Sequence, residues 1–189
     1  MTEPDHDGQG AGAGVLPLAA CERLCQGLPG AASLDAALTV IESARALALG
    51  PGLLTVHRDA SDGSDPAGEL RLERLWTSMP GAYPVGGAKR KTRSAWTRQL
   101  FGDRRLFVGE GDAALAAVFD DHAAILTLDL HAVVNVPVLR GGRCVATFNA
   151  LGVRPAWQPQ ELAAVRLLAL LATPHILAEL DRLHLDPTA

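Results

Sequence analysis

The segment VVNVPVLRGGRCVATFNALG, residues 133–152, predicts a β-hairpin, because two apolar runs flank the turn Arg140-Gly141-Gly142-Arg143. Each run contains one asparagine, Asn135 or Asn149. If Arg140 opposes Arg143, Asn135 opposes Phe148 and the two asparagines point to opposite faces. An unpaired buried amide costs about 1–3 kcal/mol, so each needs a partner. That partner is either a neighbouring loop or a ligand in a cavity.

Composition indicates a soluble globular protein. The chain has 189 residues, 48% hydrophobic and 20% charged, with a net charge of −4. This charge excludes general attraction to nucleic acid or anionic membranes. Three cysteines without framework spacing indicate a reducing compartment, and the N-terminus has no signal-peptide pattern. We expect a cytoplasmic protein with a disordered tail over 1–14 and a single domain over 15–189.

Apolar periodicity predicts the secondary structure around the hairpin. Helices are expected at about 15–28, from Ser33 to Gly50, and at about 94–101, 113–128 and 159–183. Strands are expected at 53–58, from 69, and at 105–110, whereas 77–93 is expected to be irregular. The apolar phase jumps from Leu72 to Leu75, which predicts a bulge near Arg74.

The apolar stripes of these elements predict a single core, and the stripe of the first helix is built partly of cysteines. In the first helix, Cys21 and Cys25 fall on a stripe that we expect to be buried. The predicted core consists of Leu34, Leu38, Ile41, Leu54, Val56, Val136, Val138, Leu162, Val165 and Ala169.

Hairpins pair their strands antiparallel, so this order of elements predicts an α+β fold. Over about 33–183 the chain resembles a GAF domain. VVNVPVLRGGRCVATFNAL followed by WQPQELAAVRLLALLA is similar to the GAF pattern of a Val-Pro strand, a glycine turn, a small-apolar strand and a helix entered by a glutamate. RLWTSMPGAYPVGGAKRKTRSAW with FDDHAAILTLDLHAVVNVPV resembles a bacterial subgroup of stand-alone, sensor-like GAF proteins.

The resemblance implies a GAF/PAS-like antiparallel sheet, with the N- and C-terminal helices on one face and short helices and loops over the other. It implies a ligand such as a cyclic nucleotide, a tetrapyrrole or a small acid, or no ligand. The middle segment has no cysteine where bilin-attaching members carry one. After Asn149 the sequence ALGVRPAWQPQE lacks the cyclic-nucleotide signature. We therefore leave the cofactor open.

Aromatic and polar residues of the middle segment predict a ligand cavity between the sheet and residues 77–128. Small-molecule sites are usually apolar pockets with a few polar groups. The alternative is that the aromatics only anchor loops to the core. The candidate ligand-binding residues are Trp76, Tyr83, Trp96, Phe107, His122, Asn135, Thr147 and Asn149.

A basic run over residues 89–105 leads into the helix near Ser94, where an anion could bind. GGAKRKT lacks the spacing of a phosphate-binding loop, and the alternative is a solvated charged surface. The weak candidates for anion binding are Lys89, Arg93 and Arg98.

No catalytic or metal site is predicted. The sequence has neither H-x-x-x-H nor C-x-x-C, and no serine lies in a nucleophile elbow. Our leading hypothesis is a sensory or regulatory domain that binds a small molecule. The alternatives are a ligand-free dimerisation or scaffold module and, third, a small-molecule reductase.

The final helix predicts a homodimer through the terminal helices. One apolar stripe runs from Leu162 to Leu183, and a second set includes Leu167, Leu170 and Leu171. A helix that is apolar nearly all round needs a second partner. The alternative is a monomer in which the first two helices cover both stripes. Without an attached output domain, we expect the signal to leave through oligomerisation or a separate output protein.

Overall fold

A six-stranded antiparallel sheet forms the centre of the protein, in the order β3-β2-β1-β6-β5-β4. The computed structural model describes residues 14–62, 64–66 and 68–185. The expected tail therefore lies outside the described residues, except for Gly14. The strands are β1 (Gly52–Asp59), β2 (Leu70–Thr77), β3 (Ala88–Lys91), β4 (Phe107–Glu110), β5 (Ala132–Arg140) and β6 (Arg143–Gly152).

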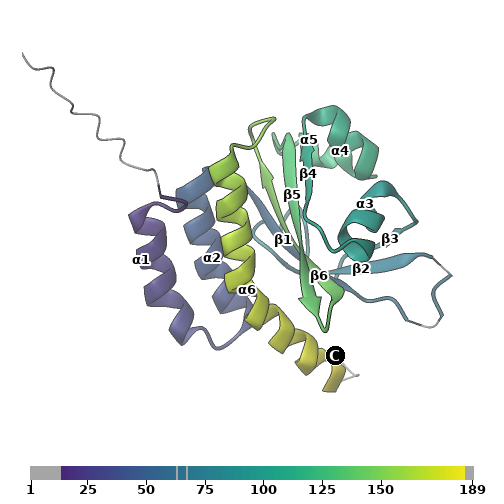
Figure 1. The fold of residues 1–189 in the computed structure, drawn as a ribbon, viewed down its shortest axis with the longest axis horizontal. Helices are drawn as coiled ribbons and strands as arrows, with labels where there is room; N and C mark the ends of the chain where they lie inside the picture. Colours follow the sequence, from purple (N-terminus) through teal and green to yellow (C-terminus); the bar gives the residue numbers. More distant parts are fainter. Residues whose placement is uncertain (1–13, 63, 67, 186–189) are drawn as a thin grey trace, which may run out of the picture.

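Two groups of helices lie on either side of this sheet (Figure 1). The long helices α1 (Leu18–Gly27), α2 (Leu34–Leu49) and α6 (Pro159–Leu185) cover one face, with the 3-10 turn η1 (Leu28–Gly30) between the first two. The short helices α3 (Ala95–Thr97), α4 (Asp112–Val118) and α5 (His122–Leu126), with the π-helical turn η2 (Arg98–Gly102), lie on the other side. This arrangement confirms the predicted α+β fold.

The main core lies between the long helices and the sheet. Leu38, Ile41, Leu54, Val56 and the other predicted core residues all belong to this cluster, with Val136 and Leu162 only partly buried. As predicted, Ser33 caps α2 by accepting a hydrogen bond from the Ala36 amide. The local helix signals and the apolar stripe of α2 therefore agree with its place in the fold.

The first helix packs differently from the prediction. Cys25 is exposed and Cys21 is half-buried, whereas Ala20 and Leu24 are buried. Ala20 and Leu24, spaced by four, form the side that faces α2, and Leu16 packs against the same core just before the helix begins. The predicted cysteine stripe is therefore wrong by a rotation of the helix.

The hairpin of β5 and β6 contains a bulge that changes its register. Leu139 pairs with Cys144 as predicted, but Val138 pairs with Ala146, which leaves Val145 as the extra residue. Every earlier pair is shifted by one, so Asn135 pairs with Asn149. The prediction that the two asparagines point to opposite faces is wrong, because one extra residue reverses the face of everything beyond it.

A second bulge lies in β2, where the jump from Leu72 to Leu75 predicted one. Val56 pairs with Trp76 and His57 with Arg74, so Leu75 is the extra residue. Trp76 consequently faces the helices, and its indole N–H donates to Asp35 Oδ1 at 2.8 Å. Arg74 faces the opposite side of the sheet.

Two further elements differ from the predictions. Residues 77–93 contain the strand β3. Its lysines obscure the apolar alternation that would have predicted a strand. In the fold these lysines are paired with aspartates of another segment. Residues 113–128 form two helices rather than one, because Phe119 adopts an extended conformation after α4. The break places Asp120 and Asp121 between the two helices.

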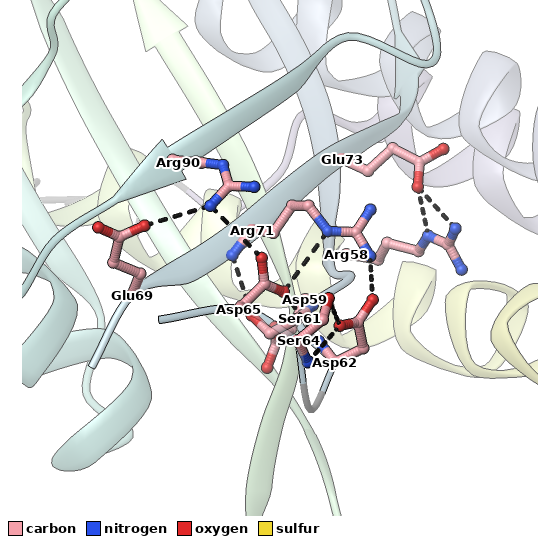
Figure 2. A network of polar contacts seen from close by, with 10 residues as sticks. All are labelled: Arg58, Asp59, Ser61, Asp62, Ser64, Asp65, Glu69, Arg71, Glu73 and Arg90. Atoms are coloured by element: carbon pink, nitrogen blue, oxygen red, sulfur yellow. Dashed lines mark hydrogen bonds and ion pairs between the residues drawn. The ribbon is translucent and has the colours of Figure 1, made fainter. Parts of the chain in front are cut away.

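Ion pairs hold the loop between β1 and β2 and the adjacent sheet edge (Figure 2). Arg58 pairs across the strands with Glu73 at 2.6 Å. Arg71 contacts Asp62 at 3.1 Å, and Arg90 of the basic run contacts Glu69 at 3.5 Å. Much of the predicted positive charge on β3 is therefore neutralised by neighbouring acids.

α6 is the one helix among the described residues that is long and apolar enough to cross a membrane, with a mean hydropathy of 1.5. One side of it packs against the sheet and α2. It contains Pro174 and changes direction partway along its length (Figure 1). Proline removes one helical hydrogen bond, which accounts for a bend.

Candidate functional site

A cavity lies on the sheet face opposite the long helices, covered by the segments that carry α3, α4 and α5. It leaves about 60 Å³ for the centres of water molecules, against the roughly 10–15 Å³ that one buried water needs. Its apolar wall consists of Leu53, Leu72, Trp96, Phe119, Ile125, Val133 and Leu151. Its polar wall consists of Thr55, His57, Arg74, Tyr83, Lys89, Lys91, Asp121, Asn135, Thr147 and Asn149.

Strand register explains why the polar residues converge. Alternate side chains of a strand share a face, so Thr55 and His57 point together into the cavity from β1. Asn149 pairs with Thr55 on one side and with Asn135 on the other. Three neighbouring strands therefore place one row of polar groups on the cavity floor.

A directional chain of hydrogen bonds runs through this row. The indole N–H of Trp96 donates to Asn135 Oδ1 at 2.9 Å, so the Asn135 amide nitrogen faces Asn149. That nitrogen donates to Asn149 Oδ1 at 2.8 Å. The Asn149 nitrogen then donates to Nδ1 of His57 at 2.9 Å and approaches the Thr55 carbonyl at 3.3 Å. Since indole N–H only donates, every amide in the chain has a defined orientation.

The chain also defines the state of His57. Nδ1 accepts a hydrogen bond, so the neutral ring carries its hydrogen on Nε2. Burial, together with the positive charges of Arg74 and Lys89, lowers the pKa of His57 from 6.5 to about 3. The imidazole is therefore neutral at physiological pH and presents an N–H to the cavity.

Arg74 is a buried cation in the polar wall of the cavity. Only 5% of the residue is exposed, and its Nη1 donates to the Pro84 carbonyl at 2.8 Å. Its guanidinium carbon lies 4.9 Å from the centre of the Tyr83 ring, a cation–π distance. Burial lowers the pKa of Arg74, although Asp121 opposes that effect. Among the described residues, no carboxylate forms an ion pair with Arg74.

Two lysines of β3 connect the sheet to the segment between α4 and α5. Lys89 pairs with Asp121, and Lys91 pairs with Asp120 at 2.8 Å while also donating to the Val118 carbonyl at 3.2 Å. Burial raises the pKa of Asp121, but the hydrogen bond and charge of Lys89 outweigh it, so the pKa is lowered overall. These pairs hold an ionised carboxylate at the cavity.

Four buried polar atoms of the cavity residues form no hydrogen bond of normal geometry among the described residues: His57 Nε2, Arg74 Nε, Tyr83 Oη and Asp121 Oδ1. The last two belong to neighbouring side chains, because the Asp121 carboxylate acts directly on the Tyr83 hydroxyl. Burial, followed by the charge of Asp121, raises the pKa of Tyr83 to about 12, so its hydroxyl stays neutral. Buried polar groups in proteins are nearly always bonded to protein or ordered water. Their concentration at one cavity marks it as the candidate site.

The structure brings together only some of the predicted site residues. Tyr83, Trp96, Asn135, Thr147 and Asn149 line the cavity, and so does Lys89 from the basic run.

The other predicted residues lie elsewhere. Trp76 belongs to the helix-side core, Phe107 packs beside the cavity on β4, and His122 begins α5 outside the lining. Arg93 and Arg98 border a separate surface depression. The aromatic grouping in sequence is a poor guide here, because strand phase decides which face each residue reaches.

Four functional candidates were missed from the sequence: His57, Arg74, Lys91 and Asp121. The alternation of Leu54 and Val56 with Thr55 and His57 could have indicated a polar second face on β1. No local signal identifies Asp121, because its partner is supplied by a distant strand.

The thiol of Cys144 is buried away from the cavity lining, and burial raises its pKa to about 12. Within the described ranges, no group of three or more His, Cys, Asp or Glu side chains could hold a metal ion.

Comparison with known proteins identifies this fold. No protein-family model and no curated protein matches the sequence. Among solved structures, the GAF domain of a phosphoenolpyruvate-protein phosphotransferase from Coxiella burnetii is 16% identical, with a TM-score of 0.60, covering 91% of this chain and 96% of that one. The chain has the GAF fold.

Two other GAF-fold structures extend the likeness. The GAF domain of a two-component sensor histidine kinase from Bacillus halodurans is 16% identical, with a TM-score of 0.59, covering 80% of this chain and 97% of that one. The chromophore-binding domain of a bacteriophytochrome from R. palustris is 14% identical, with a TM-score of 0.58. That match covers 84% of this chain and 60% of the phytochrome domain. At these identities the likeness concerns the fold.

Proposed function

We propose that this chain is a sensory or regulatory GAF-fold domain that binds a small organic molecule in the cavity. The observation that carries the proposal is the set of four buried polar atoms around one cavity that form no hydrogen bond of normal geometry among the described residues. The similar folds of the sensor kinase and phosphotransferase domains favour a regulatory role over a catalytic one. The high pKa of buried Cys144 argues against a thiol-based reductase.

Occupancy of the cavity could be transmitted by the segment that closes it. Asp121 and Phe119 line the cavity from the connection between α4 and α5, which Lys89 and Lys91 tie to β3. A ligand that alters these ion pairs would shift the position of this segment, and a partner protein could recognise that local change.

The tryptophans provide a direct test. Trp96 lines the cavity, whereas Trp76 is bonded to Asp35 on the opposite face and Trp157 packs against the helix-side core. In nuclear magnetic resonance spectra, a cavity ligand from a metabolite library should shift the Trp96 indole signal and leave the other two nearly unchanged. Native mass spectrometry of freshly purified protein should show any copurifying ligand. Protein without a bound molecule, and a Trp96 signal unchanged across the library, would contradict the proposal.

We also propose that the domain is a homodimer through its terminal helices. Leu170 of α6 is 67% exposed, and Leu167 on the same helix is exposed as well. These side chains support an interface, because α1, α2 and the sheet leave them uncovered. A ligand-free dimerisation module is the second candidate function that this surface favours. We place the protein in the cytoplasm, with a separate output protein as its partner.

A further inference from the structure

The four unpartnered atoms of the cavity differ in the groups that they can bind. His57 Nε2 must donate, because Nδ1 of the same ring accepts from Asn149. Arg74 Nε also only donates. Asp121 Oδ1 only accepts while the carboxylate is ionised, and the Tyr83 hydroxyl beside it can do either. A matching ligand needs acceptors for two donors and a donor for one carboxylate.

Charge balance indicates the charge of that ligand. Lys89 is paired with Asp121 and Lys91 with Asp120, so these four groups compensate one another. Arg74 remains, buried and without a carboxylate in ion-pair contact among the described residues. A buried charge without a counter-charge is costly, and one negative charge would compensate it.

The cavity also limits the size of the ligand. Its volume of about 60 Å³ is several times the roughly 10–15 Å³ that one water requires, so it has room for a small molecule.

We infer that the cavity binds a small 2-hydroxycarboxylate monoanion, an assignment that rests on the proposed function. The carboxylate accepts from His57 Nε2 and Arg74 Nε, and the hydroxyl donates to Asp121 Oδ1. The Tyr83 hydroxyl contributes the remaining hydrogen bond. Glycolate and lactate have the required size, charge and donor.

Related small molecules each leave one requirement unmet. Acetate has no donor for Asp121. Glycine has a donor, but its ammonium group cancels the charge that Arg74 requires. Glycolamide keeps the hydroxyl and is neutral.

A matched panel tests the assignment on the unmodified protein. Glycolate, lactate, acetate, glycine and glycolamide are titrated by calorimetry at neutral pH, with the Trp96 indole signal as a report of location. Glycolate or lactate should bind, and the other three should bind about tenfold more weakly or not at all, because each leaves a buried group unpaired or uncompensated.

Arg74→Gln gives a second test, since glutamine removes the charge while retaining a donor. It should weaken glycolate binding by about tenfold or more and abolish the preference for glycolate over glycolamide. Arg90→Gln is the matched control, because the Arg90 side chain is 62% exposed on β3 and outside the cavity lining. If Arg74→Gln does not fold, the panel on the unmodified protein decides alone.

The outcomes separate this inference from the proposed function. Binding by glycolamide, glycine or acetate as tight as by glycolate overturns the hydroxycarboxylate assignment and leaves a ligand cavity in place. A panel in which nothing binds also overturns it. The proposed function fails as well only if no compound of the wider library shifts Trp96.

Discussion

Asn149 on β6 determines the protonation state of His57 on the adjacent strand β1. Its amide nitrogen occupies Nδ1 of the imidazole, and its oxygen is held by Asn135, which is held in turn by Trp96. Only neutral His57 can accept from that nitrogen, so the amide chain and the low pKa of the ring agree. The two asparagines of the hairpin therefore have a joint structural role in orienting one side chain of the cavity.

Breaking this chain at its middle should destabilise the protein. Asn135→Leu leaves the Trp96 N–H and Asn149 Oδ1 without partners, and we expect a loss of about 1–3 kcal/mol in the free energy of unfolding. Urea denaturation measures the loss. In a double-mutant cycle, Trp96→Phe should cost less in the Asn135→Leu background than alone. Additive losses would contradict a coupled chain.

The pKa of His57 predicts how stability depends on pH. The folded-state pKa of about 3 lies below the ordinary value of 6.5, so the unfolded chain binds the proton more readily. The contribution of neutral His57 is complete above pH 6.5 and declines as the pH falls towards 3, on the order of a few kcal/mol in total. Urea midpoints should fall less steeply on acidification in His57→Gln than in the natural protein.

His131 provides a control of opposite sign. Hydrogen bonds with Asp112 and Asp129 raise its pKa, so its contribution is present below pH 6.5 and is lost as the pH rises through the folded-state value. His131→Gln should therefore make the fall on acidification steeper. A profile for His57→Gln that runs parallel to that of the natural protein would contradict a neutral, buried imidazole.

Among the secondary-structure elements, α2 shows most clearly how local sequence and packing agree. Ser33 caps its start, Gly50 ends it with a φ of 77°, and its apolar stripe faces the sheet. The strands are less determined by local pattern, because β2 and the β5–β6 hairpin each contain a bulge. A bulge shifts the pairing register by one residue, so the residues beyond it point to the opposite face of the sheet.

The two sides of α2 give a matched prediction. Leu38 is fully buried, so Leu38→Ala should lower the free energy of unfolding by about 2–5 kcal/mol. Leu47, on the same helix, is 49% exposed, and Leu47→Ala should have a much smaller effect. Urea denaturation compares the two variants. Equal losses would place the core on the wrong side of α2.

At the scale of the whole molecule, the sheet separates two environments. The face towards α1, α2 and α6 is an apolar core, whereas the other face holds buried charges and amides around the cavity. The outer side of α6 carries apolar residues that neither environment covers. We have proposed ligand binding for the cavity and association for the outer side of α6.

The proposed homodimer depends on that outer surface of α6. We expect sedimentation equilibrium at micromolar concentration to give twice the chain mass of 19.8 kDa. Leu170→Glu should dissociate the dimer while preserving the fold, because that side chain is exposed. Leu177→Glu is unsuitable as a test, since Leu177 packs against the core. A mass near 19.8 kDa throughout would contradict the dimer.

By itself, the sequence determined the α+β class, the helix caps, the hairpin turn and most of the helix-side core. These features depend on neighbours close along the chain or on an apolar period. Even the bulge near Arg74 was visible as a break in that period.

Only the tertiary structure decided which residues line the cavity. A bulge in the hairpin moved Asn135 and Asn149 onto one face, and the bulge in β2 sent Trp76 away from the cavity and Arg74 into it. The half-buried charges of Lys89 and Asp121 are tolerated because these partners, 32 residues apart in sequence, meet in space. Local propensity does not encode such pairing, since its free energy exists only when the segments pack together.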